Sequence, residues 1–268
     1  MFTEKQLAQY RDDGFIVADY RLPEQTLEAL RRDVEALVGD DPNMRQLTPT
    51  ILDHDQCFIK YANDPEILNR VEQLAGSDLA LWNMSLFGKP AHDGKKVPWH
   101  QDGEYWPIRP LATTRVWIAL DAASRDNGCL CYVRGSHKRR ELYAHHEAED
   151  HSMLFQYGIR PEEIDPDDVF ELELQPGEMA IHDVFMVHGS QANSTDHNRR
   201  AIVLNFMPTT SYFDHDLAAK QFAEMDIDFD HSRRSLFLLR GVDRCGRNDF
   251  QIGHTPDDTF DQAAGTSC

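Results

Sequence analysis

The chain has 268 residues, of which 41% are hydrophobic and 27% are charged, an ordinary balance for a soluble globular protein. Its 46 acidic residues outnumber its 27 basic residues, so the formal net charge is −19. This excess argues against nonspecific nucleic-acid binding and against docking on anionic membranes, both of which need clustered Lys and Arg. It also weighs against a large polyphosphate ligand such as a coenzyme A thioester, unless a basic patch lies inside the fold.

The chain carries no signal for a membrane or for secretion. It contains no run of about 18 apolar residues, so we expect no transmembrane helix. Its first residues, MFTEKQLAQYRDDG, lack the apolar stretch of a signal peptide. The five cysteines are odd in number and lack a CxxC motif, so we expect no disulfide framework and a cytoplasmic location.

The first third of the chain, residues 1–76, predicts mainly helix. A helix capped by Thr3 runs to about residue 10 and is ended by Gly14, and residues 15–17 form a short strand. A second helix opens at Leu22-Pro23-Glu24, shows apolar residues at helical spacing, and is stopped by Gly39. A third helix follows Asp64-Pro65 and ends at Gly76.

After Gly76 the sequence changes to short strands separated by Gly, Pro and Asn. We expect eight strands, near residues 79–87, 97–102, 113–121, 129–133, 171–174, 178–182, 184–188 and 199–207. This number of short strands predicts a mainly β fold, a double-stranded β-helix or jelly roll with flanking helices. We expect one domain over residues 1–268, with a β core at 77–210 and a C-terminal extension at 211–268 that holds one or two helices and a frayed end.

An acidic, poorly periodic segment interrupts the predicted strands at about residues 141–170. Residues 141–173 contain eleven acidic residues and one Arg, Arg160. The segment is either a lid over a site or a solvent-exposed surface loop. As a lid it would favour a substrate with a cationic group.

The most informative short motif is His100-Gln101-Asp102. On a strand, residues two apart face the same way, so an imidazole and a carboxylate would lie side by side. These are two of the three ligands of a 2-His-1-carboxylate site, which binds non-haem Fe(II) and leaves positions open. The same two residues also fit a hydrogen-bonded structural pair. His145-His146-Glu147 has the same spacing without a strand, and four histidines followed directly by Asp have the wrong parity: His54, His92, His182 and His215.

The third metal ligand would come from a later strand. His188 ends the apolar run 184–187 and precedes a Gly turn, as expected at the mouth of a barrel, although it also fits an ordinary strand-end histidine. Eleven residues later Arg199 and Arg200 open another apolar strand. A buried Arg needs an anion, and its guanidinium suits a carboxylate. Because the two neighbours face opposite ways, only one can point into the barrel.

Several stretches together resemble the phytanoyl-CoA dioxygenase family of Fe(II)- and 2-oxoglutarate-dependent oxygenases. The resemblance covers roughly residues 1–210, including the early DGF strand, and rests on KPAHDGKKVPWHQDGEYWPIRP, NGCLCYVRGSH, Gly177-Glu178 and HGSQANSTDHNRRAIVLNF. It implies a double-stranded β-helix with iron on His100, Asp102 and His188. It also implies 2-oxoglutarate held by Arg199, a pocket lined by Trp117, and O2 as co-reactant. The intact Asp102 favours hydroxylation over the halogenation of relatives that lack this carboxylate.

Strand parity suggests which other residues reach the cavity. On residues 81–87 one face carries Asn83, Ser85 and Phe87, so Asn83 is a candidate for binding the cosubstrate and Ser85 for binding the substrate. Arg115 shares its face with Trp117. It points inward, which would favour a substrate with a carboxylate or phosphonate, or it forms a salt bridge at the rim.

Aromatic residues surround the His100 motif. Trp99, Tyr105 and Trp106 could cage a quaternary ammonium group, although core packing is the commoner role of such residues. Cys129 and Cys131 alternate on a strand and are expected to pack there.

We therefore predict a dioxygenase that hydroxylates a small polar or zwitterionic molecule with release of succinate and CO2. The alternatives are a non-catalytic ligand-binding protein and a Zn or Mn cupin-like enzyme on the same fold. The sequence leaves the oligomeric state open.

Overall fold

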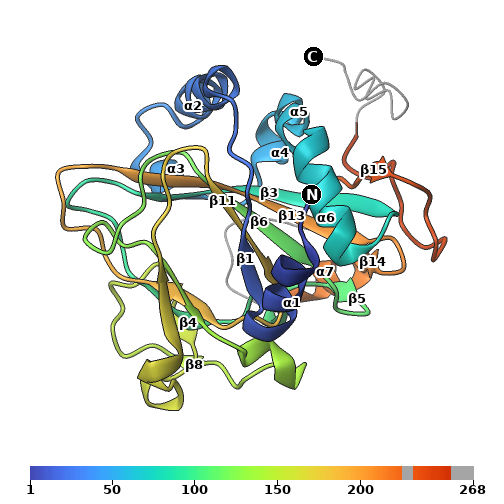
Figure 1. Ribbon diagram of the computed structural model, residues 1–268. Helices are drawn as coiled ribbons and strands as arrows, with labels where there is room; N and C mark the ends of the chain where they lie inside the picture. The colour runs from blue at the N-terminus through green and yellow to red at the C-terminus, as the bar shows by residue number, and fades with distance from the viewer. Residues whose placement is uncertain (225–231, 255–268) are drawn as a thin grey trace.

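The computed structural model describes residues 1–224 and 232–254. Two antiparallel sheets face each other, and helices cover the outer face of the larger one (Figure 1). The larger sheet has the order β1-β11-β6-β13-β3-β15, with β2 also paired to β3. Its strands are β1 (Phe15–Val17), β2 (Leu47–Thr48), β3 (Leu79–Lys89), β6 (Thr114–Ala119), β11 (Met179–Asp183), β13 (Arg199–Pro208) and β15 (Phe237–Arg240).

The smaller sheet has the order β10-β7-β12-β4 and carries much of the candidate site. Its strands are β4 (Val97–His100), β7 (Leu130–Val133), β10 (Val169–Leu172) and β12 (His188–Ser190). Two short pairs lie outside both sheets: β5 (Ile108–Arg109) with β14 (Tyr212–Phe213), and β8 (His146–Glu147) with β9 (Tyr157–Gly158). The predicted double-stranded β-helix with flanking helices is confirmed.

The three helices expected in the first third are present. They are α1 (Glu4–Asp13), α2 (Glu24–Val38) and α6 (Pro65–Ala75). Thr3 caps α1 in a reciprocal capping box, and Gly14 ends it in the left-handed conformation that glycine adopts readily. The Asp64 carboxylate accepts backbone N–H bonds at the start of α6.

Shorter helical elements were not predicted. They are α3 (Pro42–Gln46), α4 (Ile51–His54), η1 (Gln56–Phe58), α5 (Ile59–Ala62), η2 (Asp102–Glu104), η3 (Ser136–Arg139), η4 (Pro161–Glu163) and η5 (Pro166–Asp168). Among the described residues of the C-terminal extension, helix α7 spans His215–Glu224. Residues 225–231 and 255–268, including the expected frayed end, lie outside the described residues.

The predicted strand over 184–188 is wrong. The Asp183 carboxylate accepts a hydrogen bond from the Phe185 N–H at 2.9 Å, and the Met186 N–H donates to the Asp183 carbonyl at 3.0 Å. These bonds form a turn after β11, so strand pairing resumes only at β12. The apolar run 184–187 is buried as a turn and not as a strand. Similarly, the strand expected over 97–102 ends at His100.

Residue alternation divides the interior into two parts. On β6, Val116 and Ile118 face the helices and join the main apolar core. Arg115 and Trp117 point the other way, between the two sheets, where Trp117 joins a second cluster. The helices therefore stabilise the outer face of the large sheet, while its inner face remains available for polar groups.

The acidic segment 141–173 lies along the smaller sheet. The backbone N–H groups of Leu154 and Ile159 donate to the carbonyls of Lys96 and Trp99. Ten of its eleven acidic residues are exposed, and Glu171 is partly buried. The segment contributes its backbone and apolar side chains to the fold and directs its charge to solvent.

In residues 1–224 and 232–254, no helix combines the length and hydropathy needed to cross a bilayer. The thiols of Cys129, Cys131 and Cys245 are free, and the first two are buried on or beside β7, as expected for packing residues.

Candidate functional site

Three potential metal ligands converge between the two sheets. Strand β12 pairs with β4 so that His188 lies opposite His100, and Asp102 follows β4 at the start of η2. The Nε2 atoms of His100 and His188 lie 3.7 and 3.6 Å from carboxylate oxygens of Asp102. All three ligand atoms lie within 4.8 Å of one another, and the residues are 5%, 8% and 3% exposed in chain order.

The backbone orients both imidazoles. The Nδ1 atom of His100 hydrogen-bonds the Pro98 carbonyl at 2.9 Å, and that of His188 bonds the Met186 carbonyl at 2.9 Å. A carbonyl can only accept, so each Nδ1 carries the proton and each Nε2 presents a lone pair. Burial lowers the pKa of His188 well below its ordinary range and keeps the ring neutral, as a metal ligand requires.

Asp102 is ionised although it is buried. Burial alone would raise its pKa, but the Arg115 guanidinium and the nearby imidazoles outweigh that effect and hold the pKa well below its ordinary range. Arg115 forms a buried ion pair with Asp102. Arg115 therefore points inward as its strand parity suggested, and its salt bridge is with the site carboxylate and not at a rim.

His182 is a further histidine at the site that was not predicted from the sequence. Its Nδ1 hydrogen-bonds the hydroxyl of Tyr132 at 2.8 Å, and its Nε2 lies 3.9 Å from the Asp102 carboxylate. Its sequence neighbour Asp183 has the wrong parity for a shared strand face, but the carboxylate near His182 is that of Asp102 at the start of η2. In the short strand β11, His182 lies opposite Arg115 and points between the two sheets. The alternation of residues along this strand could have identified it from the sequence.

The donor set fits a cation. The Asp102 Oδ2 atom forms the ion pair with Arg115 and faces the Nε2 atoms of His182 and His188 at 3.9 and 3.6 Å. The Nε2 atom of His188 carries no proton and cannot donate to the carboxylate, so its lone pair and that of His100 are left to a cation shared with Asp102. Two imidazoles and one carboxylate on one side of a cavity match the ligands preferred by non-haem Fe(II).

Arg199 occupies the same cavity as the candidate ligands. It is 3% exposed, donates to the carbonyls of Gly128 and Phe87, and has a free Nε. No carboxylate of the described residues lies within ion-pair distance of it, and burial lowers its pKa to about 10. Trp117 lies under the guanidinium at 5.6 Å. The cavity is lined by Phe87, Val97, His100, Arg115, Trp117, Leu130, His182, His188, Gly189, Ser190 and Arg199.

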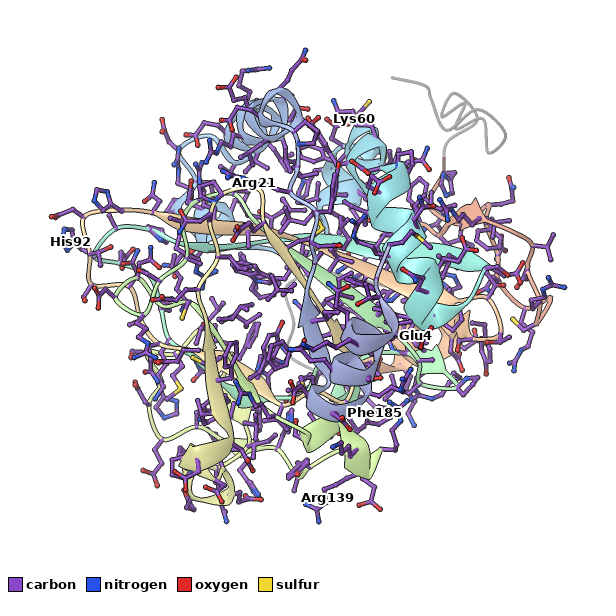
Figure 2. All side chains as sticks on the ribbon, viewed as in Figure 1. Glu4, Arg21, Lys60, His92, Arg139 and Phe185 are labelled. Carbon is purple, nitrogen blue, oxygen red and sulfur yellow. The ribbon has the colours of Figure 1, made fainter. Side chains whose placement is uncertain are left out.

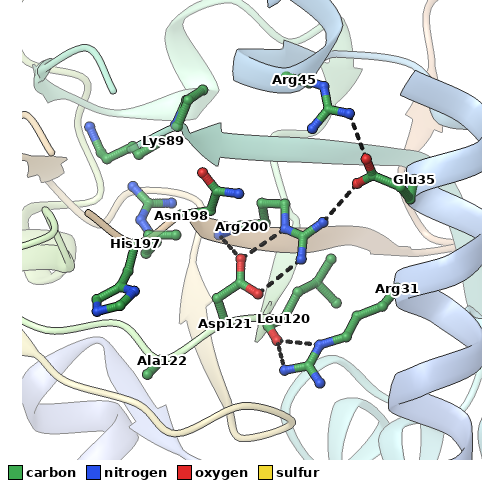
Figure 3. Close-up of polar contacts among 12 residues, drawn as sticks. Arg31, Glu35, Arg45, Lys89, Leu120, Asp121, Ala122, His197, Asn198 and Arg200 are labelled. Carbon is green, nitrogen blue, oxygen red and sulfur yellow. Dashed lines mark hydrogen bonds and ion pairs between the residues drawn. The ribbon is translucent and has the colours of Figure 1, made fainter. Parts of the chain in front are cut away.

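Arg200 faces the opposite way from Arg199. Its guanidinium and backbone N–H bind the Asp121 carboxylate, and a further nitrogen contacts Glu35 at 3.2 Å (Figure 3). Glu35 is shared with Arg45, so Arg200 belongs to a network that ties the large sheet to α2 and α3. Of these two neighbouring arginines, Arg199 is therefore the one that faces the cavity.

Lys89 is a second cationic side chain at the Arg199 end of the cavity. The register of β3 and β13 places Lys89 opposite Arg199, and Lys89 is 2% exposed. Its Nζ donates to the Lys95 carbonyl. Burial, assisted by Arg199, lowers its pKa to about 6, so near neutral pH Arg199 is the main positive charge there.

Two predicted residues of β3 do not line the cavity. The Asn83 amide donates to the Ser85 hydroxyl at 2.8 Å, and Ser85 donates to the Pro49 carbonyl at 3.0 Å. Asn83 also accepts a hydrogen bond from Arg234, a residue that the sequence analysis did not single out. Only Phe87 of the predicted face reaches the cavity wall.

The aromatic residues near His100 have different environments. Trp99 packs against a small apolar cluster with Val133, Ile159 and Val187, which makes it a packing residue. The Tyr105 hydroxyl hydrogen-bonds His145 Nδ1 at 2.6 Å, and burial raises the pKa of Tyr105 to about 12.

The acidic segment reaches the site through two of its residues. The His145 Nε2 accepts from the Gln101 N–H, and the Phe155 ring packs edge-on against His100 at 5.6 Å. The acidic segment thus covers one side of the candidate metal ligands with neutral groups.

His92, in contrast, lies far from the candidate ligands, on the exposed loop between β3 and β4, where it pairs with Asp196 (Figure 2).

Comparisons with known proteins agree with this geometry. The family model for phytanoyl-CoA dioxygenase matches residues 10–201. The chain is 27% identical over 241 residues to the human protein named "Phytanoyl-CoA dioxygenase, peroxisomal", which covers 80% of this chain and 70% of the human one.

Solved structures share the fold. A non-heme monooxygenase, ThoJ, solved as a nickel complex, is 26% identical with a TM-score of 0.64 and covers 96% of this chain and 91% of its own. The epimerase SnoN, solved with Fe3+, alpha ketoglutarate and nogalamycin RO, is 22% identical with a TM-score of 0.64 over 78% of this chain and 85% of its own.

Proposed function

The chain belongs to the phytanoyl-CoA dioxygenase family of Fe(II)- and 2-oxoglutarate-dependent oxygenases, and on that premise we propose that it hydroxylates a small polar or zwitterionic molecule. The single observation that carries the proposal is the cavity shared by His100, His188 and Arg199, whose guanidinium has no ion pair among the described residues. The Asp102 carboxylate lies within 4.8 Å of the ligand atoms of both histidines. Neither a simple binding protein nor a Zn or Mn cupin-like enzyme needs that arginine.

In this proposal His100, Asp102 and His188 hold Fe(II), and Arg199 binds the distal carboxylate of 2-oxoglutarate. The two histidines are fixed in the metal-binding tautomer by their backbone hydrogen bonds. Arg199 is held by the Gly128 and Phe87 carbonyls and retains a free Nε for an anion. Trp117 lies beneath the guanidinium and limits where the cosubstrate can lie.

Bound Fe(II) supplies activation of O2 coupled to the oxidative decarboxylation of 2-oxoglutarate. The balanced reaction converts a C–H substrate, 2-oxoglutarate and O2 into the C–OH product, succinate and CO2. The protein contributes orientation and the exclusion of water. Phe155 covers the His100 ring, and apolar Phe87 and Leu130 form part of the cavity wall.

The cavity wall supports a small substrate with both polar and apolar parts. Arg115 lies at the wall beside His182, and its guanidinium is 5.2 Å from the centre of the Phe87 ring. The carboxylates of the acidic segment face solvent, so their charge does not line the cavity. The substrate is therefore recognised by buried groups and not by the acidic surface.

Anaerobic reconstitution tests the proposal. The purified protein with Fe(II) and 2-oxoglutarate should develop the visible charge-transfer band of a keto acid chelated to iron. Arg199→Met should require far more 2-oxoglutarate for the same band, whereas Arg200→Met, which lies on the opposite face, should not. If iron binds and no band forms at saturating 2-oxoglutarate, the cosubstrate assignment is wrong.

A further inference from the structure

A row of polar side chains crosses the inner face of the large sheet next to the candidate metal ligands. Register pairs Arg115 on β6 with Asn205 on β13, and Asn205 with Asn83 on β3. Arg115 is the member that contacts Asp102. Adjacent strands lie about 4.8 Å apart, so the Asn83 end of the row is about 10 Å from the Arg115 end.

A second buried arginine, Arg234, lies at the Asn83 end of this row. It precedes β15, is 5% exposed, and donates to the Asn83 side-chain oxygen. Its Nε has no hydrogen-bond partner. None of the carboxylates in residues 1–224 and 232–254 forms an ion pair with Arg234, and burial lowers its pKa to about 10. A guanidinium buried without an anion is costly in a folded protein.

Other groups beside Arg234 also lack partners. The indole Nε1 of Trp82 is buried without an acceptor, and the Asn205 side-chain oxygen is buried without a donor. Trp82 lies 5.7 Å from the Arg234 guanidinium and packs edge-on against Trp106 at 4.7 Å. Trp106 in turn lies 5.8 Å from the Arg115 guanidinium. A continuous path of rings and amides thus joins Arg234 to the metal-ligand end of the row.

The row is distinct from the cosubstrate position. Arg199 and Asn205 lie on the same face of β13, six residues apart, or about 20 Å along a strand. An anion at Arg234 would therefore not be the carboxylate that Arg199 holds. The inner face carries one buried arginine toward each end, Arg199 and Arg234, and Arg115 contacts the candidate metal ligand Asp102.

We infer that Arg234, with the Asn83 amide N–H and the Trp82 indole N–H, binds an anionic group of the substrate, a carboxylate or a phosphonate. The inference rests on the proposed function and names the chemistry of its substrate. The anionic group lies several bonds from the carbon that is hydroxylated, because the row separates Arg234 from the metal ligands. Arg234, which has no ion pair among residues 1–224 and 232–254, would gain its anion when substrate binds.

The test uses the full chain loaded anaerobically with Fe(II) and 2-oxoglutarate. It is titrated with short carboxylates and alkylphosphonates, each beside its uncharged amide or diester, and binding is measured by calorimetry and by a shift of the visible band. We expect some acids to bind and their neutral counterparts to bind at least tenfold more weakly. Arg234→Met should weaken acid binding about 10- to 100-fold, the usual size of a lost charge-assisted hydrogen bond.

Arg233→Met is the matched control, because Arg233 is exposed and carries the same charge one residue away. It should bind the acids as the wild type does, and Arg234→Lys should lose part of the affinity. The melting temperature of ligand-free Arg234→Met should change little, because removal of a buried charge without an ion pair among the described residues offsets the donor that Asn83 loses, whereas loss of a purely structural arginine would lower it.

The inference is overturned if the band forms and no acid binds, if amides bind as tightly as acids, or if Arg234→Met keeps the wild-type affinity. The carboxylate and phosphonate arms identify which anion is recognised. Absence of the band in the wild type would instead refute the proposed function, so the two failures are separable.

Discussion

Replacing Lys89 by Met should make the stability of the protein less dependent on pH. Lys89 is 2% exposed, and burial with the nearby Arg199 charge lowers its pKa to about 6 from an ordinary value of 10.5. Between these two values the unfolded chain binds a proton that the folded protein does not. Stability contributed by the neutral amine is therefore lost progressively as the pH falls from about 10.5 to about 6.

The size of this effect follows from the pKa shift. One pKa unit corresponds to about 1.4 kcal/mol, so the wild type should lose up to about 3 kcal/mol between about pH 9 and about pH 7 because of Lys89. Met keeps the apolar stem and removes the titration. It also leaves the Lys95 carbonyl without its Lys89 donor, which is a constant cost of about 1–3 kcal/mol at every pH.

Urea unfolding of both proteins across this pH range, without metal or 2-oxoglutarate, measures the effect. The free energy of unfolding of Lys89→Met minus that of the wild type should rise steadily as the pH falls. Lys95→Met, which alters an exposed neighbour, should show a nearly constant difference. A constant difference for Lys89→Met as well would refute the buried, neutral state of Lys89.

Two further predictions concern the site. Arg199→Met should raise the dissociation constant of 2-oxoglutarate about 100-fold or more, because a bidentate carboxylate contact in a buried pocket is lost, while the iron content measured by metal analysis stays the same. Arg200→Met should leave the dissociation constant of 2-oxoglutarate unchanged and lower the free energy of unfolding by about 1 kcal/mol, because its ion pair with Asp121 is lost. Equal effects of the two variants on the affinity for 2-oxoglutarate would contradict the assignment of Arg199 to the inner face of β13 and Arg200 to the outer face. His182→Phe should lower the free energy of unfolding by about 1–3 kcal/mol, because the buried Tyr132 hydroxyl loses its partner; a neutral result in urea unfolding would contradict that contact.

Local spacing placed His100 and Asp102 together, whereas the roles proposed for His188 and Arg199 rested on the family resemblance. His100 and Asp102 are two residues apart, and this proximity survives although Asp102 begins a 3-10 helix where a strand was expected. Arg199 and Arg200 had to face opposite ways on any strand, so the choice between them needed only the fold. Such features depend on the near neighbours of each residue in the chain.

Features that depend on distant pairing were missed. His182 contacts Asp102 across 80 positions of sequence, and Arg234 reaches Asn83 across 151. No local pattern marks either contact. The strand predicted over 184–188 was wrong for a different reason. The Asp183 carboxylate stabilises a turn, although the apolar residues that follow it are typical of a strand.

The position of the acidic segment also required the structure. Its composition was compatible with a lid or with a solvent-exposed surface loop. The segment has features of each, because part of it covers the site and part of it faces solvent. Phe155 and His145 lie against the site residues, while its carboxylates face solvent. Sequence composition could not show which side chains of the segment turn inward.

The central claim is that His100, Asp102 and His188 hold an iron that couples 2-oxoglutarate oxidation to hydroxylation. Succinate formation by the purified protein with Fe(II), O2 and 2-oxoglutarate tests it most directly, with Asp102→Ala as the comparison. We expect the wild type to release succinate and CO2 in equal amounts and Asp102→Ala to release neither above the protein-free background. An iron-loaded wild type that forms no succinate, or an Asp102→Ala protein that forms it at the wild-type rate, would contradict the account.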